Sequence, residues 1–159
     1  KSLPLSSREP VDESGVVAGW DAEIAAVRTA AARLLAAHPD AEAAAVFEAD
    51  AAPRRGVLPR RAGRAPLRDL DRAVYAYLDL CARLAAEPDL PPRASGAVAL
   101  GRAAAAPTPI RAVIAGHALR ATDAGWSFGT GPVLEDTAAG LLRFLGRRTA
   151  AAPRPAAGA

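Results

Sequence analysis

The side chains best suited to chemistry in this sequence lie close together near its carboxyl end. His117 is followed by Arg120 and Asp123, and Asp123 begins an Asp-Ala-Gly turn signal. If the turn brought Asp123 to His117, the carboxylate would orient the imidazole as in a general base. The nearest hydroxyl groups, on Thr122 and Ser127, lie in no recognisable nucleophile elbow. The pattern therefore favours a structural histidine, and we assign no catalytic residue.

A short aromatic segment, Gly-Trp-Ser-Phe-Gly-Thr-Gly-Pro, follows the turn. The order of its glycines does not fit a dinucleotide-binding loop, and we expect them to supply the positive φ angles of hairpin turns. Trp126 and Phe128 alternate with Ser127, so both rings should lie on one face of a sheet. There they would either cover the core, which the pattern favours, or line an apolar groove. The candidate ligand-binding residues are His117, Arg120, Asp123, Trp126 and Phe128.

Metal and thiol chemistry have few candidate ligands. Two histidines and one cysteine cannot complete a closed zinc site without carboxylates at unpredictable positions. Cys81 falls in an apolar helical stripe, where a free cysteine usually behaves as a small buried hydrophobic residue. His38 precedes a proline at a helix end, where a capping role is favoured over ligation. The residues therefore predict neither a metal site nor a cofactor.

Composition indicates a thin core and excludes a transmembrane helix. Alanine supplies much of the 51 % hydrophobic content and aromatic residues only 4 %, so leucine, valine and isoleucine must form the core. No apolar run reaches the length of a membrane span, and no basic-then-apolar leader opens the chain. We expect a cytoplasmic protein with no membrane partner. The chain begins at Lys1 and contains no methionine, which is typical of a trimmed chain or a fragment.

An arginine-rich segment at residues 53–65 is the main candidate for contact with a polyanion. The net charge of +3 and the pI of about 9.7 permit such a partner. However, prolines and glycines in the segment are typical of a linker, and no aromatic residue is interleaved for base stacking. A solvated linker is therefore favoured over a nucleic-acid site. The residues of that alternative site would be Arg60, Arg61 and Arg64.

Apolar spacing predicts three helices before residue 90. Apolar residues recur every three or four positions from 20 to 38, and Pro39 ends that helix. Asp40 can cap a second, alanine-rich helix that stops near residue 53. A leucine stripe that includes Cys81 predicts a third helix over about 66–87.

The carboxyl-terminal part is predicted to combine short strands with a final helix. Residues 97–106 are compatible with a short strand or with helix. Thr108-Pro109 could begin another helix, but β-branched residues and Gly116 favour a meander of two or three strands from residue 110. Helix and strand both stay open for residues 109–119. Asp136 or Thr137 then caps a final helix with inward leucines.

These elements predict an α+β fold, in which an alanine-rich helical part packs against a small antiparallel sheet with a closing carboxyl-terminal helix. The predicted divisions are a flexible arm at 1–19, a helical subdomain at 20–90, a small α+β subdomain at 94–149 and a disordered tail at 150–159.

The carboxyl-terminal part, about residues 110–148, resembles a known domain. The stretch ALRATDAGWSFGTGPVLEDTAAGLLRFLGRR is similar to the C-terminal domain of the mycothiol-dependent maleylpyruvate isomerase and DinB-like superfamily. The strand, Trp-containing turn, Gly-Pro and closing helix of that domain correspond to Leu119–Asp123, Trp126, Gly131-Pro132 and Leu141–Arg147. The resemblance implies a small α+β domain, similar to sterol carrier proteins, which in the family follows a metal-binding four-helix bundle.

The amino-terminal part departs from that family at the metal site. Val16–Glu23 is faintly similar to the bundle helix in which a metal-ligand histidine precedes Trp-Asp, but Ala18 and Gly19 stand there instead. The histidine-based metal site of the family therefore has no counterpart here. No catalytic residue is carried over.

We accordingly expect an accessory or small-ligand-binding domain that resembles the C-terminal module of maleylpyruvate isomerase-like proteins and has no metal site of its own. Its ligand would be small and apolar, or conjugated to a thiol; the resemblance would bring in a thiol cofactor such as mycothiol. A partner domain or a second copy of the chain could complete the protein. Two alternatives stay open: a thiol-dependent isomerase or transferase whose metal ligands lie outside this chain, and a basic interaction module for nucleic acid or protein.

Overall fold

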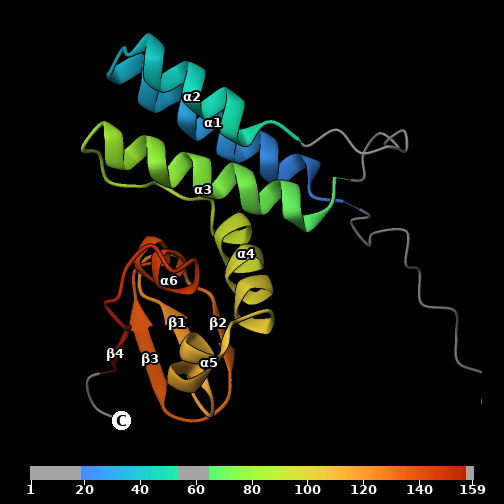
Figure 1. The fold of residues 1–159 in the computed structure, drawn as a ribbon, viewed down its shortest axis with the longest axis vertical. Coiled ribbons are helices and arrows are strands. Elements are labelled where there is room, and N and C mark those ends of the chain that lie inside the picture. The colour runs from blue at the N-terminus through green and yellow to red at the C-terminus, as the bar shows by residue number, and fades with distance from the viewer. Residues whose placement is uncertain (1–18, 54–64, 157–159) are drawn as a thin grey trace, which may run out of the picture.

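The computed structural model describes residues 19–53 and 65–156, which form a helical layer beside a small α+β unit (Figure 1). The elements are, in order, α1 (Asp21–Ala37), α2 (Ala41–Ala51), α3 (Leu67–Arg83), α4 (Pro92–Ala104), α5 (Thr108–Ile114), β1 (Ala118–Ala121), β2 (Ser127–Gly129), β3 (Val133–Asp136), α6 (Ala138–Leu145) and β4 (Arg154–Pro155). The predicted α+β fold class is confirmed. The arm predicted at 1–19 lies, except for Gly19, outside the described residues.

The first two helices form where the sequence predicts them. The stripe of α1 buries Val27 and Ala31 completely, because apolar residues at three- and four-residue spacing share one helical face. The side chain of Asp40 caps α2, where it accepts a hydrogen bond from the amide of Ala43 at 2.8 Å. Both helices pack on α3. The third helix ends at Arg83, earlier than predicted, and Ala85 beyond it has a positive φ of 50°.

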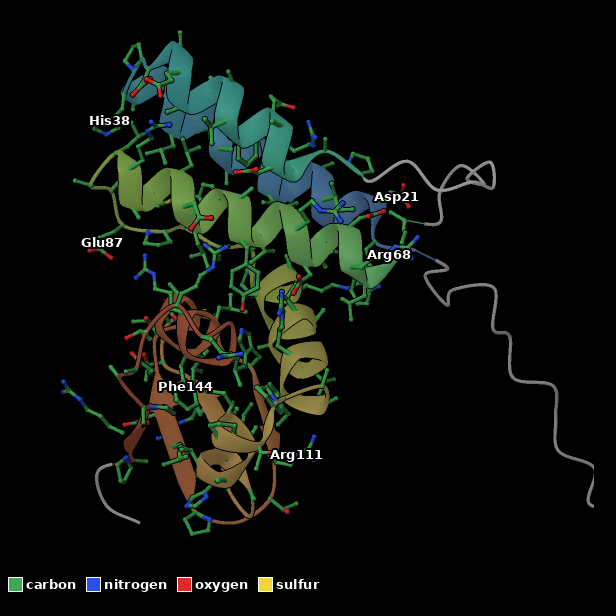
Figure 2. The ribbon with its side chains drawn as sticks, viewed as in Figure 1. Asp21, His38, Arg68, Glu87, Arg111 and Phe144 are labelled. Atoms are coloured by element: carbon green, nitrogen blue, oxygen red, sulfur yellow. The ribbon has the colours of Figure 1, made fainter. Side chains whose placement is uncertain are left out.

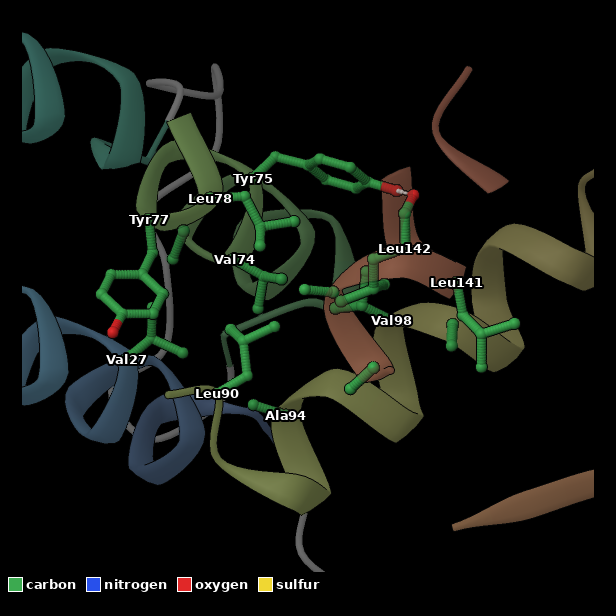
Figure 3. Close-up of a cluster of buried hydrophobic side chains, with 14 of the residues drawn as sticks. Val27, Val74, Tyr75, Tyr77, Leu78, Leu90, Ala94, Val98, Leu141 and Leu142 are labelled. Carbon is green, nitrogen blue, oxygen red and sulfur yellow. Dashed lines mark hydrogen bonds between the residues drawn. The ribbon is translucent and has the colours of Figure 1, made fainter. Parts of the chain in front are cut away.

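A continuous core joins the helical layer to the α+β unit across the predicted boundary near residue 90. One cluster of buried apolar residues includes Val74 and Leu78 of α3 as well as Leu141 and Leu142 of α6. Figure 3 shows the hydroxyl of Tyr75 pointing at the backbone carbonyl of Leu142, to which it donates a hydrogen bond at 2.7 Å. The divisions at 20–90 and 94–149 therefore share their apolar interior, and whether they fold independently stays a prediction.

Residues 97–106, for which the sequence predicts either a strand or a helix, fall mostly within the helix α4. It begins at Pro92, whose fixed φ suits a first helical position, and it buries Ala94 and Val98. The helix contacts α1, α3 and α6 and extends from the helical layer alongside the α+β unit (Figure 1). An ion pair between Arg93 Nε and Glu23 Oε1, at 3.0 Å, ties it to α1.

The strands are shorter and ordered differently than predicted. Residues 110–114 belong to α5, so the strand expected from residue 110 begins only at Ala118. The sheet order is β2-β1-β3-β4, with β1 antiparallel to β2 but parallel to β3. The sheet is therefore mixed rather than wholly antiparallel as predicted, because the chain leaves β2, crosses the end of β1 and pairs with it in parallel on its far side. Within the tail predicted to be disordered, at 150–159, Arg154–Pro155 form β4, which pairs with β3, and residues 157–159 lie outside the described residues.

The closing helix is positioned by side-chain caps at its amino terminus. Thr137 Oγ1 accepts a hydrogen bond from the amide of Gly140 at 3.0 Å, as predicted for an N-cap threonine. Asp123, from the turn after β1, accepts another from the amide of Ala138 at 2.7 Å. The predicted inward leucines, Leu141, Leu142 and Leu145, are all buried.

Buried phenols predict a loss of stability at alkaline pH. Burial raises the pKa of Tyr75 to about 12 against the opposing effect of Arg102, and burial likewise raises the pKa of Tyr77 to about 12. In the unfolded chain the pKa of a tyrosine lies near 10. The stability that the two buried, protonated phenols contribute is therefore fully present below pH 10. Above pH 10 the unfolded phenols lose protons first, and the free energy of unfolding should fall as pH rises toward 12.

Urea unfolding midpoints measured from pH 8 to pH 12 would check this expectation. Burial also raises the pKa of the Cys81 thiol, so the decline should begin somewhat below pH 10. The variant Tyr77→Phe should show a shallower decline than the wild type, because one of the titrating groups is gone. A midpoint that stays constant up to pH 12 would contradict the expectation.

Candidate functional site

The two aromatic residues of the predicted ligand site meet as expected. Trp126 and Phe128 stack with ring centroids 5.6 Å apart and planes 16° from parallel, so the alternation with Ser127 does place both rings on one face. The indole Nε1 of Trp126 donates a hydrogen bond to Ser95 Oγ at 3.0 Å. A Cβ at Gly96 would lie 3.2 Å from the indole. The ring pair thus packs against α4, and both rings are half-buried against the core.

The polar members of the predicted site have other partners. Arg120 pairs with Glu135 across β1 and β3, where the two residues are in register. In β2, Ser127 is the residue opposite Arg120, so Arg120 lies on the opposite sheet face from Phe128. The structure therefore does not bring all five candidate residues to one place.

His117 and Asp123 do not form the pair that would orient a general base. The ring Nδ1 of His117 lies 3.0 Å from the carbonyl oxygen of Ala115, and Asp123 caps α6. The sequence favours a structural histidine, and the contact with the Ala115 carbonyl is compatible with that interpretation. A turn aspartate that caps a helix fifteen residues later leaves no local sequence signal, because its partner is brought close only by the fold.

The other predicted sites fall partly outside the described residues. Arg60, Arg61 and Arg64 lie in the range 54–64, which the structure does not describe. Within the described ranges, no three His, Cys, Asp or Glu side chains gather closely enough to hold a metal ion. Cys81 is buried. In those same ranges no helix is long and apolar enough to cross a membrane.

A groove that the sequence did not predict runs between α3 and α4. Its volume is about 280 Å³. Its floor and walls combine apolar and charged groups from both helices: Leu67, Arg68, Asp71, Val98, Gly101, Arg102 and Ala105. Concave sites that combine apolar walls with a few polar groups are the usual form of small-molecule sites. We call this feature the α3–α4 groove.

Close contact between the two helices forms the apolar part of the α3–α4 groove. A Cβ at position 101 would lie 2.7 Å from Leu67 Cδ2, so glycine at this position lets the Leu67 side chain lie directly against α4. Val98 is almost fully buried beneath the groove. Ala105, at the carboxyl end of α4, is exposed at its edge.

One ion pair fixes the charged wall of the groove. Arg102 donates from Nε to Asp71 Oδ1 and from Nη2 to Asp71 Oδ2, both at 2.6 Å, which is the bidentate geometry of strong Arg–carboxylate pairs. This hydrogen bonding to Asp71 raises the pKa of Arg102. The Arg102 guanidinium carbon also lies 4.8 Å from the centre of the Tyr75 ring, so the pair is held from both sides.

Arg68 is the remaining charged group of the groove. It lies in the first turn of α3, at the amino-terminal end of that helix, and is exposed (Figure 2). In the part of the chain that the structure describes, its side chain forms no ion pair or hydrogen bond. A cation without a protein partner, at the edge of an apolar groove, is available to a ligand.

The sequence does not predict the groove, because residues 97–106 are compatible with a short strand as well as with helix. The groove residues of α4 and its C-cap, at positions 98, 101, 102 and 105, have the three- and four-residue spacing of one helical face. A helical assignment places them together, although their position opposite Leu67 and Asp71 depends on how α3 and α4 pack.

Comparison of the chain with protein-family models, curated proteins and solved structures gives no significant match.

Proposed function

We propose that this chain is a small-ligand-binding accessory domain and that its ligand occupies the α3–α4 groove. The observation that carries the proposal is the combination, in one groove, of an apolar floor, a fixed Arg102–Asp71 pair and Arg68, which has no ion pair among the described residues. The volume of about 280 Å³ suits a ligand of one or two rings, because drug-sized ligands usually occupy larger pockets.

Binding is favoured over catalysis because the candidate chemical groups have structural partners. His117 contacts the backbone, Arg120 pairs with Glu135 and Asp123 caps α6. The α+β architecture of the carboxyl-terminal part is compatible with the resemblance to the maleylpyruvate isomerase C-terminal module. That resemblance, which concerns about residues 110–148, implies a small apolar compound or a thiol conjugate, whereas the α3–α4 groove lies outside those residues.

The proposal predicts that filling the α3–α4 groove weakens the binding of a small apolar probe. The neutral dye N-phenyl-1-naphthylamine, whose fluorescence rises in apolar surroundings, is a suitable probe. Ala105→Phe places a ring at the exposed edge of the groove, and we expect the dissociation constant to rise about tenfold or more, which corresponds to about 1.4 kcal/mol of lost binding energy. Fluorescence titration of the purified protein measures the effect.

The matched control is Ala104→Phe. Ala104 is also exposed and is the adjacent residue of α4, but it does not line the groove. It should leave the dissociation constant unchanged, and circular dichroism should show that both variants stay folded. If the wild type does not bind the dye, or if both variants weaken binding equally, the groove is not the ligand site.

A further inference from the structure

We propose that the ligand of the α3–α4 groove carries one anionic group, a carboxylate or a sulfonate, and that Arg68 binds it. This inference rests on the proposed function, because it concerns the same groove and names the chemical class of its ligand. The class is a small, one- or two-ring apolar acid.

The charge balance of the groove favours an anion. The groove has three ionisable side chains, and two of them, Asp71 and Arg102, neutralise each other in a bidentate pair at 2.6 Å. Because both oxygens of Asp71 are engaged, its charge neither binds Arg68 nor strongly repels an incoming carboxylate. The net charge of the lining is therefore +1, and it belongs to Arg68.

The neighbouring acidic residue of α3 faces away from the groove. Asp69 lines a separate cavity together with Asp21 and Ile24 of α1, and its carboxylate is 3 % exposed. Successive residues of a helix point about 100° apart, so Arg68 and Asp69 lie on different faces of α3. Arg68 therefore remains the cation that a ligand in the groove would meet.

Arginine also suits the chemistry of a carboxylate. Its planar guanidinium offers parallel N–H donors that match the two carboxylate oxygens. The adjacent floor, formed by Leu67 and Val98, would receive the apolar body of the same molecule. The start of α3 adds a partial positive charge, and its N-cap, Pro66, makes no side-chain hydrogen bond to the helix amides.

Two probes with the same rings separate the anion from the apolar body. 1-Anilinonaphthalene-8-sulfonate carries an anionic group on the skeleton of N-phenyl-1-naphthylamine, which has none. We expect the wild type to bind the anionic probe about fivefold more tightly, as one exposed charge-assisted contact would give. Arg68→Gln should bind the two probes about equally, while its affinity for the neutral probe stays that of the wild type. Arg68→Lys should restore part of the preference.

Arg33→Gln is the charge-matched control, because Arg33 is an exposed arginine of α1 outside the groove. It should keep the fivefold preference. If Arg68→Gln keeps the preference while Ala105→Phe still weakens binding of the neutral probe, the inference about Arg68 is wrong and the proposed function stands. If neither probe binds the wild type, both are wrong. If Arg33→Gln lowers the preference as much as Arg68→Gln, net charge alone explains it and the inference is overturned.

Discussion

Replacing Tyr75 with alanine should lower the free energy of unfolding by about 3–5 kcal/mol, the usual cost of removing a buried aromatic ring. The Tyr75 side chain is 5 % exposed and lies where α3 meets α6. Arg102 and Arg148 lie over its ring, with guanidinium carbons 4.8 and 4.6 Å from the ring centre. The alanine variant would lose these contacts and leave a cavity at the junction between the helical layer and the α+β unit.

Tyr75→Phe separates the ring from its hydroxyl. The hydroxyl donates to the carbonyl oxygen of Leu142 at 2.7 Å, and this oxygen also accepts the amide of Gly146 at 2.8 Å. Because Leu142 keeps that second partner, the phenylalanine variant should lose only about 1 kcal/mol. Equal losses in the two variants would mean that the hydroxyl, rather than the packing of the ring, joins the two parts.

The two tryptophans can report separately on the two parts of the core. Trp20 precedes α1 and Trp126 precedes β2, and the chain has no other tryptophan. In urea, each of the single-tryptophan variants Trp20→Phe and Trp126→Phe should show its tryptophan fluorescence and its far-ultraviolet circular dichroism change in coincident transitions, because one apolar cluster spans both parts. Tyr75→Ala should shift both transitions. A shift confined to the Trp126 signal would show that residues 20–90 and 94–149 unfold independently.

The helices of the amino-terminal part could be predicted because their apolar residues contrast with their neighbours. In α1 and α3, large apolar residues recur every three or four positions, and charged residues occupy the positions between them. Pro39 marks the end of α1. The segment of α4 lacks this contrast, because alanine and glycine fill most of its positions. Its buried face becomes visible only where Val98 packs between α3 and α6.

The sheet order and the candidate site depend on contacts that no local pattern encodes. The short β1 pairs with β2 through a turn signal that the sequence does show, but its parallel pairing with β3 requires the chain to cross the end of β1. The α3–α4 groove likewise joins Asp71 to Arg102, thirty-one residues apart. Two residues of the predicted ligand site, Arg120 and Phe128, likewise lie on opposite sheet faces, which their separation in the sequence does not reveal.

Replacing Gly131 with alanine should lower the free energy of unfolding by about 3 kcal/mol or more. This glycine lies in the connection between β2 and β3, where the chain crosses the end of β1. Its φ is +102°, a conformation that an alanine rarely adopts. A Cβ there would overlap the carbonyl oxygen of Gly116, which is backbone and cannot rotate away. The strand crossing would therefore have to open, with loss of the pairing between β1 and β3.

Gly125→Ala is the matched control for this crossing. Gly125 also has a positive φ, +68°, but a Cβ there would meet no atom within 4 Å. Gly125→Ala should lower the free energy of unfolding by only about 1 kcal/mol, the cost of a positive φ at an alanine. Urea unfolding measures both costs, and the near-ultraviolet circular dichroism of Trp126 should weaken in Gly131→Ala alone. Equal costs would mean that the crossing relaxes freely, and the close approach of Gly131 to Gly116 would then not be what places β3 beside β1.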